Sequence, residues 1–156
     1  MIIASFIELK IYIMKKLLVL GFVIISFASF SQTVKFVNQL KQTKQSYLDR
    51  GYTLVDQISD SIESGNPLVS SNIDFDYNSY YIVLVQLDGC LYCDFDIKYV
   101  DDKEFMLPVN FEFSTQNDLK QGLYKFQNDV NKVGKFVVFL DSDLPYYANI
   151  FVFKKN

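Results

Sequence analysis

The stretch Tyr80–Asp102, YYIVLVQLDGCLYCDFDIKYVDD, contains two strand-like patterns joined by a short turn. Its first part, Tyr80–Leu87, is almost entirely apolar, which is typical of a strand covered on both faces. Polar and apolar residues then alternate from Asp94 to Val100, as in a strand with one wet face and one buried face. We therefore expect a central strand, a tight turn and a second strand with an acidic outer face.

Similar patterns continue along the chain, which is rich in Tyr, Phe, Val and Ile. Short β-prone runs separated by turn residues are typical of a sandwich or barrel. We predict an all-β protein with one N-terminal helix, folded as a jelly-roll-like antiparallel β-sandwich of about seven to eight strands. The residues at 52–62 fit a helix face as well as a strand. The expected strands are Ile73–Phe75, Tyr80–Leu87, Phe95–Val100, Phe105–Phe113, Gly122–Phe126, Lys135–Leu140 and Tyr147–Phe153.

One helix is expected before the strands, over Thr33–Arg50. Gly51 stands where a left-handed residue closes many helices. The pattern predicts an amphipathic helix within 32–51 and a β-sandwich domain over 52–156. Apolar residues recur on one helix face at the spacing of three to four that a helix requires: Phe36, Val37, Leu40, Tyr47 and Leu48.

The first 31 residues have the pattern of a secretory signal peptide. Lys15 and Lys16 follow a second methionine, Met14, and an apolar run and small residues come after them. We expect translation to start at Met14 and cleavage to follow Ser31. The predicted location is the periplasm, the cell surface or the medium, and an uncleaved segment would instead attach the chain to a membrane.

The composition excludes several function classes. The sequence has no histidine, which rules out Ser-His-Asp and Cys-His catalysis and every His-ligated zinc site. Loss of residues 1–31 removes three lysines and one glutamate and takes the net charge from −3 to −5. With Arg50 as the single arginine, the chain has no basic surface for nucleic acid. We predict that it is not an enzyme.

Cys90 and Cys93 are the two cysteines of the sequence. In an exported protein such a pair favours a disulfide, here one that closes the turn between two strands. A Cys-x-x-Cys pair is also found in thiol-disulfide enzymes, which place the first thiol at a helix N-terminus. No helix pattern begins here, so the disulfide is our prediction and redox activity its alternative.

Carboxylates gather on both sides of the second strand pattern. Asp94 and Asp96 share one strand face, and Asp101 and Asp102 lie in the expected hairpin turn beyond it. Calcium needs several converging oxygens, so these four residues are a candidate calcium site. The alternative is that they simply occupy the wet face of the sheet. No other cofactor is predicted.

The order of these parts resembles a group of small exported bacterial proteins of uncharacterised function that have a pre-peptidase C-terminal-like β-sandwich. The turn after Asp102 lacks the glycine of that pattern. The resemblance implies export, a jelly-roll-like sandwich and a non-catalytic accessory or interaction role. The matching residues are Gly51-Tyr52, Asp88, Cys90, Cys93, Asp94–Ile97, Asp101-Asp102, a G-x-aromatic step at Gly122–Tyr124 or Gly134–Phe136, and Ala148–Phe153.

The sequence therefore predicts an exported, non-catalytic β-sandwich protein that acts as a binding, accessory or structural module. Its alternatives are a calcium-dependent ligand-binding domain and a thiol-disulfide protein. Another exported protein or a cell-surface component is the expected kind of partner. Nucleic acid is excluded, and a membrane is contacted only through an uncleaved signal segment. The sequence does not identify the ligand-binding residues.

Overall fold

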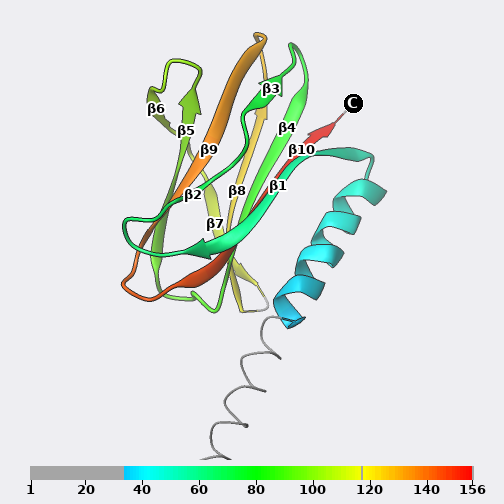
Figure 1. The fold of residues 1–156 in the computed structure, drawn as a ribbon. Helices are drawn as coiled ribbons and strands as arrows, with labels where there is room; N and C mark the ends of the chain where they lie inside the picture. Colours follow the sequence, from blue (N-terminus) through cyan, green and yellow to red (C-terminus); the bar gives the residue numbers. More distant parts are fainter. Residues whose placement is uncertain (1–33, 117, 156) are drawn as a thin grey trace, which may run out of the picture. The chain divides into compact units, whose positions relative to one another are not determined.

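A computed structural model describes residues 34–116 and 118–155. Their strands form two antiparallel sheets packed face to face, so the predicted β-sandwich is confirmed (Figure 1). Sheet I has the strand order β1-β10-β4-β8-β7, and sheet II has the order β2-β9-β5-β6 with β3 also paired to β9. The strands are β1 Tyr52–Ile62, β2 Leu68–Val69, β3 Ile73–Phe75, β4 Tyr80–Asp88, β5 Asp94–Asp101, β6 Met106–Pro108, β7 Glu112–Gln116, β8 Leu119–Gln127, β9 Lys132–Asp141 and β10 Tyr146–Lys155.

The two most apolar strands lie side by side inside sheet I. Strand β4 pairs with β10 on one side and with β8 on the other. It is buried without interruption from Tyr81 to Leu87, and β10 is buried from Ala148 to Phe153. A strand covered on both faces needs apolar side chains at successive positions, because neither face meets water. The prediction of a central, doubly covered strand at Tyr80–Leu87 is confirmed.

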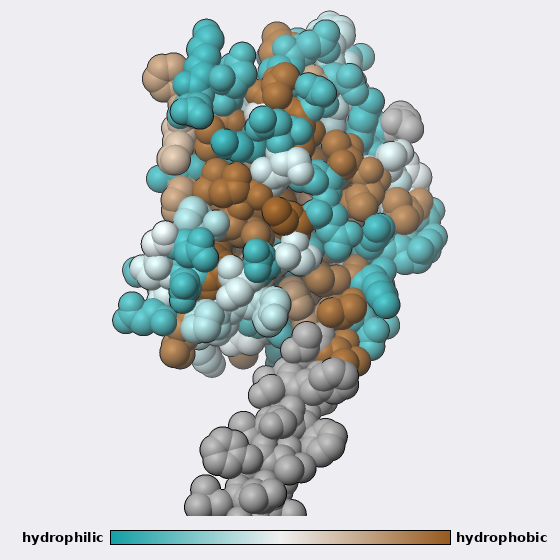
Figure 2. Space-filling model, viewed as in Figure 1, coloured by the Kyte–Doolittle hydropathy of each residue, from teal (hydrophilic) through white to brown (hydrophobic). Residues whose placement is uncertain are grey.

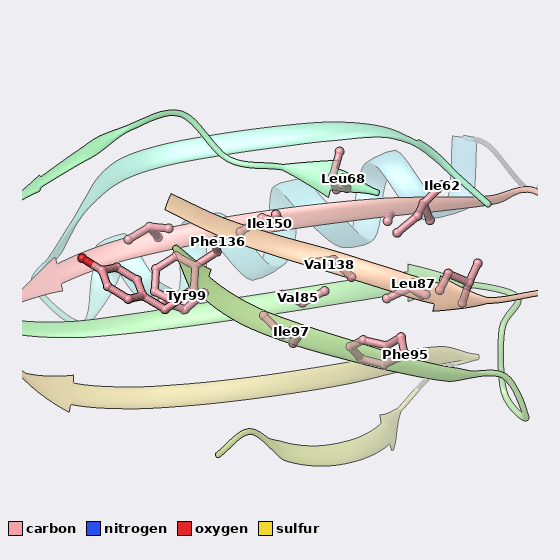
Figure 3. Packing of buried hydrophobic residues seen from close by; sticks show 14 of the residues in the cluster. Ile62, Leu68, Val85, Leu87, Phe95, Ile97, Tyr99, Phe136, Val138 and Ile150 are labelled. Carbon is pink, nitrogen blue, oxygen red and sulfur yellow. The ribbon is translucent and has the colours of Figure 1, made fainter. Parts of the chain in front are cut away.

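The core lies between the two sheets, where each strand contributes every second side chain. Val85 and Ile150 of sheet I belong to the same buried cluster as Ile97 and Val138 of sheet II (Figure 3). Aromatic rings fill one part of this layer. Phe75 makes an edge contact with Tyr81 at a centroid distance of 5.0 Å. The alternation seen in the sequence of β5 therefore has its expected cause, a single buried face.

One expected strand was wrong. The run Phe105–Phe113 forms two separate strands, β6 in sheet II and β7 in sheet I. Pro108 has no N–H to donate, and β6 ends at this residue. Val109 and Phe111 then pack against the core as the chain crosses between the sheets. Together with β1 and the short β2, this division gives ten strands in the described residues rather than seven to eight.

The residues before the sandwich also have a defined structure. Residues 34–49 are helical, and Gly51 has a φ of 83° and donates its N–H to the Leu48 carbonyl at 2.9 Å, which is the predicted C-terminal cap. Val37 is exposed, although the spacing had placed it on the apolar face. The contacts divide the chain into two units, Met1–Gln42 and Thr43–Asn156.

The ambiguous residues 52–62 form strand β1, which pairs with β10 along its whole length. The predicted signal peptide, residues 1–31, lies outside the described residues. Within the part of the chain that the structure describes, no helix has the length and apolar character needed to cross a membrane.

Candidate functional site

The outer face of sheet II carries the polar residues of the opening stretch. Strands β5 and β9 pair so that Asp94 lies opposite Asp141, Asp96 opposite Phe139 and Lys98 opposite Val137. The residues between them on each strand, such as Ile97, are buried in the core. Because side chains alternate between faces, these three pairs project to the other side of the sheet.

A shallow depression of about 250 Å³ lies at the end of this face. Phe139 is half-buried in it. The Lys98 ammonium lies 5.6 Å from the centre of the Phe139 ring and 3.5 Å from the Asp96 carboxylate. Figure 2 shows one face of the molecule, on which hydrophobic side chains gather in the middle with hydrophilic ones around them. The depression is lined by Asp94, Phe95, Asp96, Phe139, Leu140 and Asp141.

The charges in the depression are mostly negative. Asp94 and Asp141 are directly opposite each other on neighbouring strands, an arrangement of like charges that destabilises a sheet. Lys120, which comes from β8 of sheet I, lies 3.6 Å from the Asp94 carboxylate and also donates to the Cys93 carbonyl. The remaining carboxylate oxygens are acceptors that point to solvent, so the depression favours groups that donate hydrogen bonds.

The predicted disulfide is present between Cys90 and Cys93, whose Cα atoms are 5.5 Å apart. It closes the turn between β4 and β5, and Cys90 is buried in the core while Cys93 is partly exposed. The turn passes directly from one strand to the next. The first cysteine therefore does not stand at a helix N-terminus, the position it has in thiol-disulfide enzymes, and redox activity stays an untested alternative.

The four candidate calcium ligands are not brought together. Asp94 and Asp96 begin β5, whereas Asp101 ends it, so roughly 20 Å of extended chain separates the two pairs. The Asp101 carboxylate accepts the N–H groups of Lys103 and Phe105 at 3.0 and 2.9 Å, which fixes the turn before β6. Among residues 34–116 and 118–155, no three acidic or cysteine side chains are grouped closely enough to hold a metal ion. The calcium site stays an untested prediction, and the separation of the two pairs disfavours it.

The sequence did not single out Phe139 or Asp141 as neighbours of Asp94 and Asp96. Phe139 lies within an unbroken apolar run, FVVFL, so alternation could not show which of these side chains face outward. The pairing of β9 with β5 joins residues far apart in the chain, and only the sheet register places them together. Asp141, which follows the apolar run, was the one residue whose polarity could have indicated a site at this end of the strand.

Comparisons with known proteins leave the family open. No protein-family model and no curated protein matches the chain. Among solved structures, the chain is similar to the CBM22-1–GH10 modules of an N-terminal endo-1,4-β-D-xylanase 10B from Clostridium thermocellum, complexed with xylohexaose. The TM-score is 0.38 and the sequence identity 11%, over 65% of this chain and 26% of that chain. This chain thus spans about a quarter of the length of the xylanase chain. Because no family model matches, the resemblance to the pre-peptidase C-terminal-like proteins stays a prediction.

Proposed function

We propose that the protein is an exported, non-catalytic binding module that holds its ligand on the outer face of sheet II. One observation carries the proposal. The half-buried ring of Phe139 lies in a depression between the carboxylates of Asp94, Asp96 and Asp141. Small-molecule sites are usually hollows lined by apolar and aromatic side chains with a few polar groups, and this depression has such a lining.

The chemistry of the face suits a polyhydroxylated ligand, and we propose a short oligosaccharide. Its hydroxyl groups would donate hydrogen bonds to Asp94, Asp96 and Asp141, which are acceptors only. Its apolar C–H surface would pack on the ring of Phe139. Lys98, already held near this ring and Asp96, supplies a donor for hydroxyl oxygens. An anionic ligand is disfavoured because the carboxylates outnumber the lysines here.

Two further features support export and a non-catalytic role. The segment from Met14 to Ser31 has the order of a signal peptide, and a disulfide between Cys90 and Cys93 is typical of an oxidising compartment. The absence of histidine from the sequence removes the commonest general acid and base. An accessory role at the cell surface or in the periplasm is therefore part of the proposal.

The test is direct binding of the purified protein to a panel of soluble oligosaccharides, measured by calorimetry. For a bound sugar, we expect Phe139→Ala to weaken the affinity by about tenfold or more, because the ring supplies the apolar surface. Phe105→Ala is the matched control, since Phe105 is an exposed phenylalanine in the turn before β6. Both variants should remain folded in thermal melts, with Phe139→Ala the less stable of the two because its ring is half-buried.

Two results would contradict the proposed site. One is the failure of every oligosaccharide in the panel to bind at millimolar concentration. The other is a binding isotherm that Phe139→Ala leaves unchanged. Backbone amide shifts recorded during a titration would place the contact independently. We expect the largest shifts in β5 and β9, around Asp96 and Phe139.

A further inference from the structure

Uncharged polar side chains form one continuous row across the outer face of sheet I. Ser59 of β1 is opposite Asn149 of β10, which is opposite Gln86 of β4, and Gln86 is opposite Gln121 of β8. The row ends at Ser114 of β7. The side chains of Ser59 and Asn149 are hydrogen-bonded to each other at 2.5 Å. The row thus reaches the edge of the sheet with Ser114 as its last member.

Strand β7 is an edge strand whose only usual protection against further pairing is one charged side chain, Glu112. The opposite edge, β1, has a bulge between Leu54 and Asp56, and β6 at the edge of sheet II is short and ends in Pro108. Such bulges, prolines and short lengths prevent an edge from pairing with another strand. Strand β7 pairs with β8 in unbroken register and has neither Pro nor Lys, and each of its five residues is exposed.

The free hydrogen-bonding groups of this edge belong to Phe113 and Thr115. Only two residues separate Gln116 from Leu119, and the pair next to such a short connection is hydrogen-bonded. Pairs alternate along an antiparallel ladder, so Ser114 and Glu112 also bond to β8. The N–H and C=O groups of Phe113 and Thr115 therefore point away from sheet I.

We propose that two copies of this chain associate through β7, antiparallel and about a two-fold axis at Ser114. In this register Phe113 is opposite the partner's Thr115, and the two residues can exchange both backbone hydrogen bonds. Ser114 is opposite the partner's Ser114. The two sheets I then form one ten-stranded sheet, in which the row of uncharged polar side chains continues from one copy into the other.

The side chains of β7 are complementary to themselves in this register. Glu112 is opposite the partner's Gln116, whose amide donates to a carboxylate, and no two like charges are opposite each other. Phe113 is 52% exposed on the core side of the sheet. It is diagonal to the partner's Phe113, a spacing of roughly 7–8 Å that aromatic rings can bridge. Each phenyl ring therefore covers the other.

The first test is the molar mass of the purified protein by sedimentation velocity over a range of micromolar concentrations. We expect a dimer, and we expect Thr115→Pro to weaken its association by about tenfold or more, because the variant removes an interface N–H from each copy. Proline is tolerated at an edge position whose N–H faces solvent, so the fold should remain. Phe113→Ser should weaken the dimer similarly, whereas Phe105→Ser, the exposed-ring control, should not.

A second measurement tests the register itself. In Ser114→Cys the two new thiols would face each other across the axis, and mild oxidation should give a covalent dimer. Ser59→Cys, at the other end of the same polar row, is the matched control and should remain uncrosslinked. A monomeric wild-type protein overturns the proposal, as does a dimer that survives Thr115→Pro and Phe113→Ser. A dimer whose Ser114→Cys variant fails to crosslink overturns the pairing through β7.

Discussion

The ring of Tyr99, which belongs to β5, lies directly over Gly134 of the neighbouring strand β9, inside the sandwich. Its hydroxyl donates to the Val133 carbonyl at 3.2 Å, and a Cβ atom at position 134 would overlap the ring. Burial, with the nearby charges of Asp101 and Asp102, raises the pKa of the Tyr99 hydroxyl, which therefore stays a neutral donor. Packing between β5 and β9 therefore requires a residue without a side chain at position 134.

We expect Gly134→Ala to destabilise the protein by about 1–3 kcal/mol, because the added methyl group must displace a buried ring. The free energy of unfolding in urea measures the effect. The double variant Gly134→Ala, Tyr99→Val should lose less stability than the sum of the two single variants, because the smaller side chain leaves room for the methyl group. Additive losses, or a Gly134→Ala variant as stable as the wild type, would show that the ring does not depend on this glycine.

Glu104 stands at a backbone position that would suit a glycine better than a residue with a side chain. Its φ of 63° is in the left-handed region, which glycine adopts at a lower energy than other residues. Its N–H donates to the Asp101 carbonyl at 3.1 Å. We expect Glu104→Gly to stabilise the protein by about 1 kcal/mol, measured as a higher urea midpoint. Lys103→Gly, at the preceding position without a positive φ, should give no gain. A lower midpoint for Glu104→Gly would mean that the glutamate side chain contributes more than the strain removes.

The local patterns of the sequence predicted much of this fold. The apolar run at Tyr80–Leu87 and the alternation after Asp94 each describe the environment of one strand, and the structure confirmed both. Phe105–Phe113 was misread because an apolar run does not show that the chain changes sheets within it. The candidate site was only half visible, since its other half, around Phe139, joins β5 through a pairing between distant segments.

Asp76 and Lys154 form an ion pair, with 2.7 Å between Nζ and Oδ2. The hydrogen bond from Lys154, together with its positive charge, holds the pKa of the Asp76 carboxyl below its usual 3.8. A carboxyl whose folded pKa is lowered stabilises the fold above its unfolded pKa. This contribution is lost as the pH falls through the folded value.

Asp76→Asn should therefore lose less stability than the wild type when the pH falls from about 5 to about 2. Thermal melts across this range measure the difference. Asp74→Asn changes a nearby exposed carboxylate on β3 and is the control. It should lose as much thermal stability as the wild type over the same pH range. If Asp76→Asn and the wild type lose stability in parallel, the ion pair makes no contribution that depends on pH.

Millimolar calcium should leave the melting temperature of the protein unchanged. A calcium ion needs about six to eight oxygen ligands at one point, and β5 holds Asp94 and Asp96 far from Asp101 and Asp102. One oxygen of the Asp101 carboxylate, Oδ1, also accepts two backbone N–H groups of its turn. Melts with calcium and with a chelator test the expectation. A rise in melting temperature would contradict it, because a ligand that binds only the folded state must stabilise it. Loss of such a rise in Asp94→Asn, Asp96→Asn, but not in the matched Asp101→Asn, Asp102→Asn, would place the ion in the depression beside Phe139, where it would compete with the proposed sugar for the same carboxylates.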